Sequence, residues 1–337
     1  MKSKYTLFKW QTVAWVIPII LFSPLFAFAG GGQHYPLGVD SFLIGVLPPP
    51  GFYFKEYLSY YTATKLKDDS GRTLSLARDG TELDRLSAYA STSRFVWITK
   101  QKILGGFYGQ QIIVPVARVD MKLDVVTPGG PGELSERRTG VGDVVYSPYI
   151  LSWHAEDGLL HAATSLDITI PSGPHNRRHL VNIGKNFWTF TPVFGITAFL
   201  PRNQNLSAGI KLGYDFNTKS RDFIITPSTA NKIGTPALTG LETTLTPGQE
   251  FHFDYGIDYA IAKDWRIGIG GYFYQQITDD KTGGGRVKND KGRVFAIGPG
   301  VWYTYKKWIF DLHTDFETGV RNRPQGWMGW FTITHAF

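Results

Sequence analysis

An alternation of apolar and polar residues in the C-terminal third of the chain limits its fold more than any other feature. Between Phe251 and Ile261 every second side chain is apolar or aromatic, and the residues between them are polar or small. A similar alternation continues from Trp265 and returns at Trp308. A period of two is the repeat of a β-strand with two different faces, whereas an amphipathic helix repeats about every 3.6 residues. This part of the chain is therefore predicted to form strands.

The same test predicts strands over most of the chain. Twelve are expected, near residues 52–62, 85–99, 103–122, 141–154, 158–170, 186–200, 204–217, 250–262, 264–277, 292–305, 307–318 and 326–337. Very short connections alternate with long polar ones near 63–84, 123–140, 171–185, 218–249 and 278–291, and a shorter one at 319–325. Short turns at one rim, long loops at the other and an even strand number are typical of outer-membrane barrels. We therefore predict an all-β fold, a transmembrane antiparallel up-and-down β-barrel of about 12 strands.

Composition agrees with this fold and narrows the function. The mean hydropathy of -0.14 argues against a bundle of membrane helices, but alternating strands also average near zero. The main alternative is a soluble β-sandwich or periplasmic β-protein, whose strands would be shorter, typically about five or six residues. The chain has no cysteine, which excludes a disulfide scaffold, a thiol nucleophile and a Cys-ligated metal site.

The first 29 residues are predicted to be a cleaved signal peptide. Lys2, Lys4 and Lys9 give a basic start, a long uncharged stretch follows, and the stretch ends in Ala27 and Ala29, spaced as a signal peptidase requires. An uncleaved membrane anchor is the alternative, because the stretch is long enough to span a bilayer.

Residues 30–51 form a separate N-terminal segment ahead of the predicted barrel at 52–337. Its apolar residues fall at helical spacing and are candidates for a plug in the barrel lumen: Val39, Phe42, Leu43 and Val46. Pro48, Pro49 and Pro50 would link such a plug to the wall as a stiff extended stretch. A periplasmic tail packed on the rim is the alternative.

Polar residues on the predicted strands are expected to face the lumen or lie at a rim. The candidates for a solute path are Arg94, Arg118, Asp120, Asp143, His252, Asp254, Asp258, Arg266, Asp311, His313 and Asp315, with Asp167 and Glu317 beside them. Arg266 could pair with Asp254 or Asp258 on the neighbouring strand. A salt-bridged filling that stabilises the wall is the alternative to solute selection.

Four prolines fall inside predicted strands: Pro115, Pro148, Pro192 and Pro299. Each removes a hydrogen-bond donor from the sheet, and proline in strands is normally confined to edges or bulges. Because a closed barrel has no edge, these prolines are expected at bulges or at a kink that opens a lateral window into the bilayer. Pro148 is our candidate for such a window.

Several segments of the chain resemble a known family. They are residues 32–38, 47–54, 105–109, 114–116, 142–144 and 213–217, together with Pro148, Trp153 and His154. These segments resemble the phenol meta-pathway degradation family of outer-membrane proteins, which is distantly similar to channels for long-chain fatty acids and aromatic hydrocarbons. The resemblance implies an outer-membrane channel or transporter for passive uptake of small hydrophobic or aromatic compounds in a Gram-negative bacterium. It assigns no particular solute.

Two other classes of function stay open. One is a barrel enzyme, either a lipid hydrolase or a protease-like protein, and the other is a structural or adhesive barrel. The arrangement that could serve catalysis is His313 between Asp311 and Asp315 on one strand face. His154 and His161 could also meet across a short turn, but no serine motif accompanies them.

The sequence suggests partners in the cell envelope. It contains no phosphate-binding loop, dinucleotide fingerprint or metal-ligand spacing, so no cofactor or metal is predicted, and nucleic acid is not an expected partner. Basic residues in the long loops could meet lipopolysaccharide phosphates, although solvated loop charge is an equal alternative; they are Arg137, Arg138, Arg177, Arg178, Arg321 and Arg323. The terminal Phe337, with alternating residues behind it, resembles the signal that the barrel-assembly machinery recognises.

Overall fold

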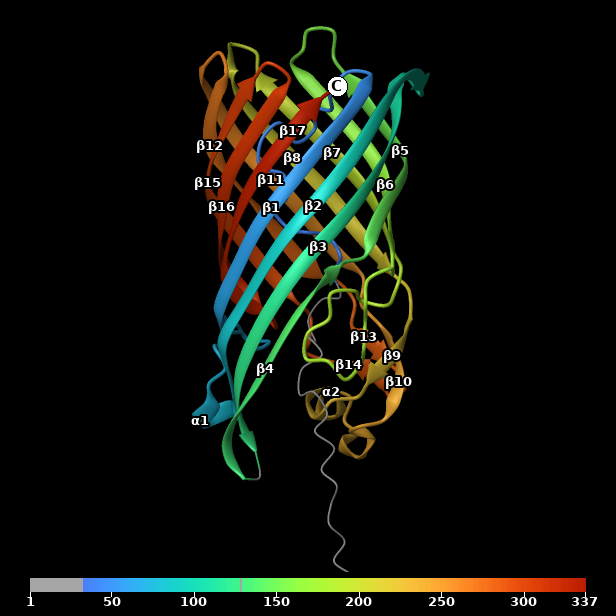
Figure 1. The fold of residues 1–337 in the computed structure, drawn as a ribbon, viewed down its shortest axis with the longest axis vertical. Coiled ribbons are helices and arrows are strands. Elements are labelled where there is room, and N and C mark those ends of the chain that lie inside the picture. The colour runs from blue at the N-terminus through green and yellow to red at the C-terminus, as the bar shows by residue number, and fades with distance from the viewer. Residues whose placement is uncertain (1–32, 128) are drawn as a thin grey trace, which may run out of the picture.

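The computed structural model describes residues 33–127 and 129–337, so the predicted signal peptide lies outside the described residues. Within them, twelve long antiparallel strands form a closed barrel (Figure 1). These are β1 (Gly51–Leu66), β2 (Thr81–Ile103), β3 (Gly106–Thr127), β5 (Val144–His154), β6 (Leu160–Ile170), β7 (Thr189–Leu200), β8 (Asn203–Asn217), β11 (Glu250–Ala262), β12 (Trp265–Gln276), β15 (Arg293–Tyr305), β16 (Trp308–Arg321) and β17 (Pro324–Ala336). The barrel closes because β1 pairs with both β2 and β17. The predicted fold class is confirmed.

The two faces of each strand are sorted as the alternation predicts. On β11, His252 and Asp254 are buried inside the barrel, whereas Ile257 is 56% exposed on the outside. On β12, Ile269 is likewise 53% exposed. An outward band of apolar side chains suits a barrel in lipid, since the lipid tails replace water around it.

The connections differ at the two ends of the barrel. The short turns lie at the upper end in Figure 1, where the chain also ends, and the long loops extend from the lower end. We call these the short-turn rim and the long-loop end. The connection between β16 and β17, which was expected to be shorter than the others at this end, spans only Asn322 and Arg323.

A further strand, β4 (Gly130–Val141), lies in a region predicted to be a loop. It pairs with β3 and, together with β2, extends the sheet beyond the barrel at the long-loop end (Figure 1). Strand β3 changes partner near Pro115. Before it, Ile113 pairs with Val145 of β5, and after it, Val116 pairs with Val141 of β4.

Two long loops build a small domain of their own at the same end. Strands β9 (Ser220–Ile224), β10 (Glu242–Thr246), β13 (Asp280–Thr282) and β14 (Gly285–Val287) form one sheet. The helix α2 (Pro227–Lys232) and the turn η1 (Pro236–Leu238) lie between β9 and β10, and the short helix α1 (Leu76–Asp79) precedes β2. No helix among the described residues is long and apolar enough to cross a membrane.

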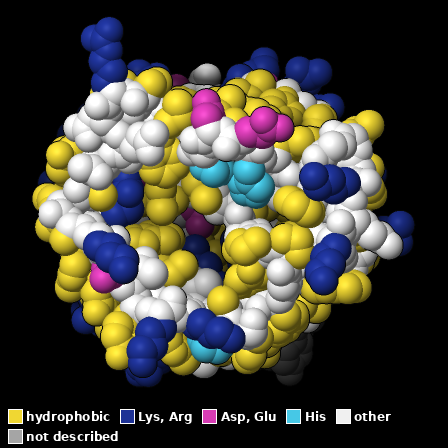
Figure 2. All heavy atoms as spheres, turned by 90° about the horizontal axis from the view of Figure 1, so that it is seen from above, with side chains coloured by type: hydrophobic (Ala, Val, Ile, Leu, Met, Phe, Trp, Pro, Cys, Tyr) yellow, Lys and Arg dark blue, Asp and Glu magenta, His cyan; other side chains and the backbone are white. Residues whose placement is uncertain are grey.

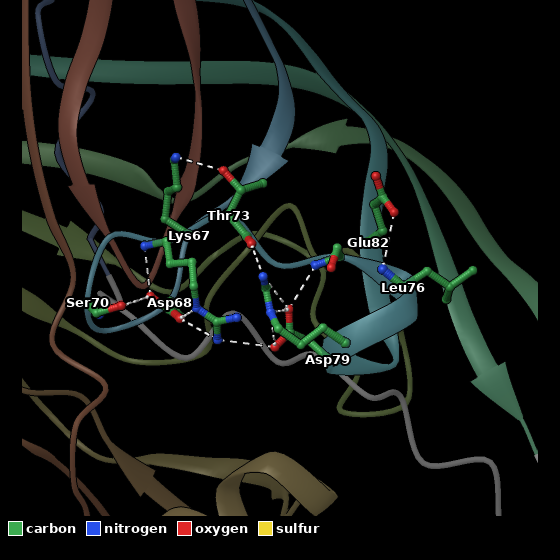
Figure 3. A network of polar contacts seen from close by, with 10 residues as sticks. Lys67, Asp68, Ser70, Thr73, Leu76, Asp79 and Glu82 are labelled. Atoms are coloured by element: carbon green, nitrogen blue, oxygen red, sulfur yellow. Dashed lines mark hydrogen bonds and ion pairs between the residues drawn. The ribbon is translucent and has the colours of Figure 1, made fainter.

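The connection between β1 and β2 is shaped by a polar network (Figure 3). Asp68 accepts hydrogen bonds from the Ser70 hydroxyl and from Arg72, and Arg72 also contacts Asp79 at 3.2 Å. Burial would raise the pKa of Asp68, but the hydrogen bonds from Ser70 and Arg72 outweigh it and lower that pKa. These exposed contacts give the loop a defined conformation without an apolar core.

Candidate functional site

The N-terminal segment, residues 33–50, lies inside the barrel and is bonded to its inner wall. The Gly38 amide donates to Asp254 on β11 at 3.0 Å, and the Gly45 amide donates to Thr197 on β7 at 2.8 Å. The Ser41 hydroxyl donates to Asp311 on β16 at 2.7 Å. Contacts with three separated strands fix the segment across the lumen.

The expected helix in this segment is not formed. Residues 33–50 run as turns and extended chain. Gly38 has a φ of 76° and Leu43 a φ of 53°, in the left-handed region where a right-handed helix cannot continue. Val39 and Phe42 are nevertheless buried, and Leu43 and Val46 are half-buried. The segment is held by hydrogen bonds to the wall in place of its own helical bonds.

Charged and aromatic contacts strengthen this attachment. Asp40 forms ion pairs with Lys55 of β1, at 3.2 Å, and with Lys211 of β8. The Tyr35 hydroxyl donates to Asp254 at 2.5 Å, and the Tyr35 ring stacks on His252 with ring centroids 4.1 Å apart. Asp254 and His252 were predicted lumen residues. Tyr35, Asp40, Lys55 and Lys211 were not, although the inward position of the two lysines could be read from strand alternation.

His313 also contacts the segment. Its Nδ1 lies 3.0 Å from Asp311 and its Nε2 lies 2.8 Å from the Gly38 carbonyl oxygen. The Ser41 hydroxyl points to Asp311 and not to the imidazole. A serine hydrolase needs the hydroxyl on a ring nitrogen that is free to take its proton. Here both ring nitrogens hold structural contacts, so the geometry matches an anchor for the segment.

Glycines on the inner wall allow the segment to approach closely. A Cβ atom at Gly256 would lie 1.8 Å from the Ser41 carbonyl oxygen, and one at Gly300 would lie 3.0 Å from the Phe42 ring. Both distances are shorter than ordinary van der Waals contact. Side chains at these wall positions would therefore displace the segment.

A cavity of about 370 Å³ remains between the segment and the inner wall, with lining residues on β1, β2, β3, β5, β6 and β7 and also on β8, β15, β16 and β17. Its lining includes apolar side chains of the wall, such as Val96, Ile113, Ile150 and Val193, and apolar residues of the segment. Arg94, a predicted lumen residue, and Lys55 also line it. Figure 2 shows the short-turn rim from above, with a recess at its centre and basic side chains around it.

The wall beside this cavity is irregular at Pro148. The register of β5 shifts against β6 between Tyr146 and Ile150 and against β3 at the facing position, as expected for a bulge. The Pro148 carbonyl accepts hydrogen bonds from the Tyr108 hydroxyl and from Gln110. Pro192 and Pro299 lie within strands β7 and β15 without a register shift beside them.

Two expected lumen residues are placed elsewhere. Arg118 is exposed beside Tyr89 on the outer face, and Asp120 on that face forms ion pairs with Arg137 and Arg85. The prediction was wrong because β3 runs past the barrel there. Its outer face meets water, and its inner face packs an apolar cluster that includes Met121.

The other predicted polar residues lie inside the barrel or at its end. Arg266 pairs with Asp258, one of its two expected partners. Asp143 lies at the long-loop end, 2.9 Å from His34, and accepts the backbone amides of Gly173 and Lys185.

The loop arginines are mostly engaged within the protein. Arg177 pairs with Asp222 and Glu242, and Arg138 pairs with Glu136. Arg178 approaches Glu242 at 3.6 Å but is exposed, as is Arg321, whereas Arg323 lies over the Tyr274 ring.

Comparisons with known proteins give one family and one similar fold. A family model described as "Putative MetA-pathway of phenol degradation" matches residues 68–333. A crystal structure of an outer membrane channel from Pseudomonas putida F1 is 14% identical, with a TM-score of 0.70 over 89% of this chain and 100% of that chain. At this identity the likeness concerns the fold.

Two further structures match more weakly. A FadL homologue from Pseudomonas aeruginosa is 9% identical, with a TM-score of 0.36 over 89% of this chain and 98% of that chain. A KdgM porin is 11% identical, with a TM-score of 0.38 over 83% and 99%. Both TM-scores are too low to carry an argument. No sequence match to a curated protein is found.

Proposed function

The chain belongs to the phenol-degradation family whose model spans residues 68–333, and on this premise we propose that it is an outer-membrane channel for passive uptake of small hydrophobic or aromatic compounds. The fold that it shares with an outer membrane channel supports the proposal. The observation that carries it is the cavity of about 370 Å³ inside the barrel, with an apolar lining and the N-terminal segment as one side. Cavities of roughly 300 to 1,000 Å³ hold small organic ligands.

In this proposal the N-terminal segment acts as a plug. Its bonds to Asp254, Thr197 and Asp311 narrow the lumen, so a large polar solute cannot pass freely. An apolar solute gains by leaving water for the cavity, by about 25 cal/mol for each Å² of apolar surface buried. The Pro148 bulge borders the cavity through Val145 and Ile150, and it is our candidate for a lateral exit into the bilayer.

The proposed location is the outer membrane of a Gram-negative bacterium, with the long loops outside the cell. Short turns on the periplasmic side and long loops on the other are the usual arrangement of such barrels. Outer-membrane lipid and lipopolysaccharide would then surround the chain, with Arg178 and Arg321 available to phosphates. Phe337 is 67% exposed at the short-turn rim, where the barrel-assembly machinery could bind it.

Uptake by cells tests the function. Cells that express the full chain should take up radiolabelled toluene faster than cells that express an unrelated barrel of the same size. The uptake rate of glycerol, which is small and polar, should rise less than that of toluene, because the cavity favours apolar solutes. Equal toluene uptake by the two strains would contradict the proposal.

Single-channel recording tests the plug. Deletion of residues 33–47 should raise the conductance of the purified protein in a planar bilayer, because the lumen contacts of the segment are lost. A Ser41→Cys variant offers a second measurement, since the chain has no other cysteine. Slow reaction of this thiol with a water-soluble methanethiosulfonate is expected in the intact chain. An unchanged conductance together with a fast thiol reaction would rule out a plug.

A further inference from the structure

We propose that the lumenal cavity selects aromatic compounds that carry a carboxylate, and that Arg94 on β2 receives this group. The inference rests on the proposed function, because it assigns a solute class to the same cavity. It differs from passage of neutral aromatic compounds because it requires a cationic group that no carboxylate of residues 33–127 and 129–337 contacts.

The contacts of Arg94 leave its charge available. Its Nε donates to the Gln111 side chain at 2.7 Å, and its Nη1 donates to the Tyr57 hydroxyl at 3.0 Å. Both partners are neutral oxygen atoms. Among the described residues no carboxylate oxygen lies within 4.0 Å of this guanidinium. Two neutral hydrogen bonds therefore orient the guanidinium, and its side chain lines the cavity.

The surrounding charges do not balance. Lys55 lies directly opposite Arg94 in the pairing of β1 with β2, and like charges at such positions repel. Asp40 is shared between Lys55 and Lys211, and Asp254 approaches Lys211 at 3.7 Å. Within the described part of the chain, three cations thus have two carboxylates in direct contact, and Arg94 is the cation without one.

Asp167, another carboxylate in the cavity lining, is already engaged. Asp167 accepts hydrogen bonds from Ser147 at 2.6 Å and Ser165 at 2.9 Å. Gln111 stands between it and Arg94, with its oxygen on the arginine and its nitrogen on Ser147 at 2.8 Å. Asp167 therefore attracts the guanidinium electrostatically from a distance but does not contact it directly.

A solute carboxylate would complete this arrangement. A guanidinium presents several N–H donors in one plane and matches the two oxygens of a carboxylate. The aromatic body of the solute would lie among Val96, Ile113 and Val193, where its apolar surface leaves water. Charge and apolar lining together favour an aromatic acid over both a neutral aromatic compound and a small inorganic anion.

Calorimetric binding to the purified full chain in detergent tests this assignment with three probes. Benzoate carries both a carboxylate and an aromatic ring. Benzamide is its neutral counterpart of similar shape, and chloride is an anion without a ring. Benzoate is expected to bind at least about tenfold more tightly than benzamide, as a charge-assisted hydrogen bond implies. Arg94→Gln should remove this preference and leave benzamide binding within about twofold, and Arg94→Lys should keep part of it.

Arg118→Gln is the matched control, because Arg118 lies on the outer face of the neighbouring strand. It should leave benzoate binding unchanged, and the heat-dependent gel mobility of each variant reports whether its barrel is folded. Equal affinity for benzoate and benzamide, or unchanged benzoate binding in folded Arg94→Gln, would overturn the inference while the channel proposal stands. Binding of chloride alone, with no gain from the ring, would also overturn it. If neither benzoate nor benzamide binds, the inference and the proposed apolar cavity fail together.

Discussion

The hydroxyl of Tyr35 in the N-terminal segment donates a 2.5 Å hydrogen bond to the carboxylate of Asp254 in the barrel wall. Asp254 is fully buried, and it also accepts the Gly38 amide. The two partners are separated by 219 residues in the chain, so this bond ties the beginning of the described chain to strand β11 of the barrel. Loss of the hydroxyl would leave a buried carboxylate short of a donor.

Tyr35→Phe is therefore expected to loosen the segment. The loss of a hydrogen bond to a buried charged group costs about 1 to 3 kcal/mol. The thiol of Ser41→Cys should react faster with a methanethiosulfonate reagent in the Tyr35→Phe background than in the parent. Tyr60→Phe, on the outer face, is the control and should not change the rate. An equal rate in all three proteins would show that Tyr35 does not hold the segment.

Gly256→Ala is expected to displace the segment from the wall. The added Cβ would lie 1.8 Å from the Ser41 carbonyl oxygen, so one of the two backbones must move. We expect more frequent open states in single-channel recordings. Gly329→Ala is the matched change, because its Cβ would meet only the Trp327 side chain, at 3.4 Å. Identical recordings from both variants would indicate that the segment does not obstruct the lumen.

Pro148→Ala should slow solute uptake while the barrel still assembles. The alanine restores a backbone N–H, and with it the option of a regular ladder in place of the bulge. Initial rates of toluene uptake and heat-dependent gel mobility measure the two effects. Pro192→Ala changes a proline that pairs in register with Leu166, so its uptake should match the parent. Uptake that is unchanged in Pro148→Ala would count against a lateral exit there.

The small domain formed by the long loops, with the sheet of β9, β10, β13 and β14, is expected to become more stable against unfolding as the pH falls. Asp290 lies outside the barrel next to Lys232 of α2, at 2.5 Å. Burial raises the pKa of Asp290 from 3.8 to about 7, and the Lys232 ammonium offsets only part of this effect. Burial also raises the pKa of the neighbouring Asp280. A carboxyl whose pKa is raised in the folded state keeps its proton while the unfolded chain loses it, so stability falls between about pH 4 and pH 7.

Hydrogen exchange of the backbone amides of residues 228–232 in α2 measures this effect. Protection should be greater at pH 5 than at pH 8, after correction for the intrinsic exchange rate. Asp290→Asn should reduce the difference, because the amide does not titrate. Protection that increases with pH in the parent chain would contradict the assigned direction.

Strand alternation located all twelve strands of the barrel wall, and for β11, β12 and β16 it also predicted which face turns outward. This succeeds because one face of every strand must be apolar in lipid, which leaves a repeat in the sequence. The same rule misplaced Arg118 and Asp120, since the outer face of β3 meets water once the strand leaves the barrel. Strand β4 was missed for a related reason: one of its faces is exposed and the other holds mostly glycine and charged residues, so its sequence carries no apolar alternation.

The sequence by itself therefore determined the closed sheet and the division of each strand in the wall into an inner and an outer face. The tertiary structure decided what the inner face does. Asp40 meets Lys55 and Lys211, which lie 15 and 171 residues away, and no carboxylate of the described residues contacts Arg94. Such contacts depend on strand register and on the path of a non-helical segment across the lumen. Neither the register nor the path of the segment leaves a periodic pattern in the sequence, because both are set by the closure of the whole barrel.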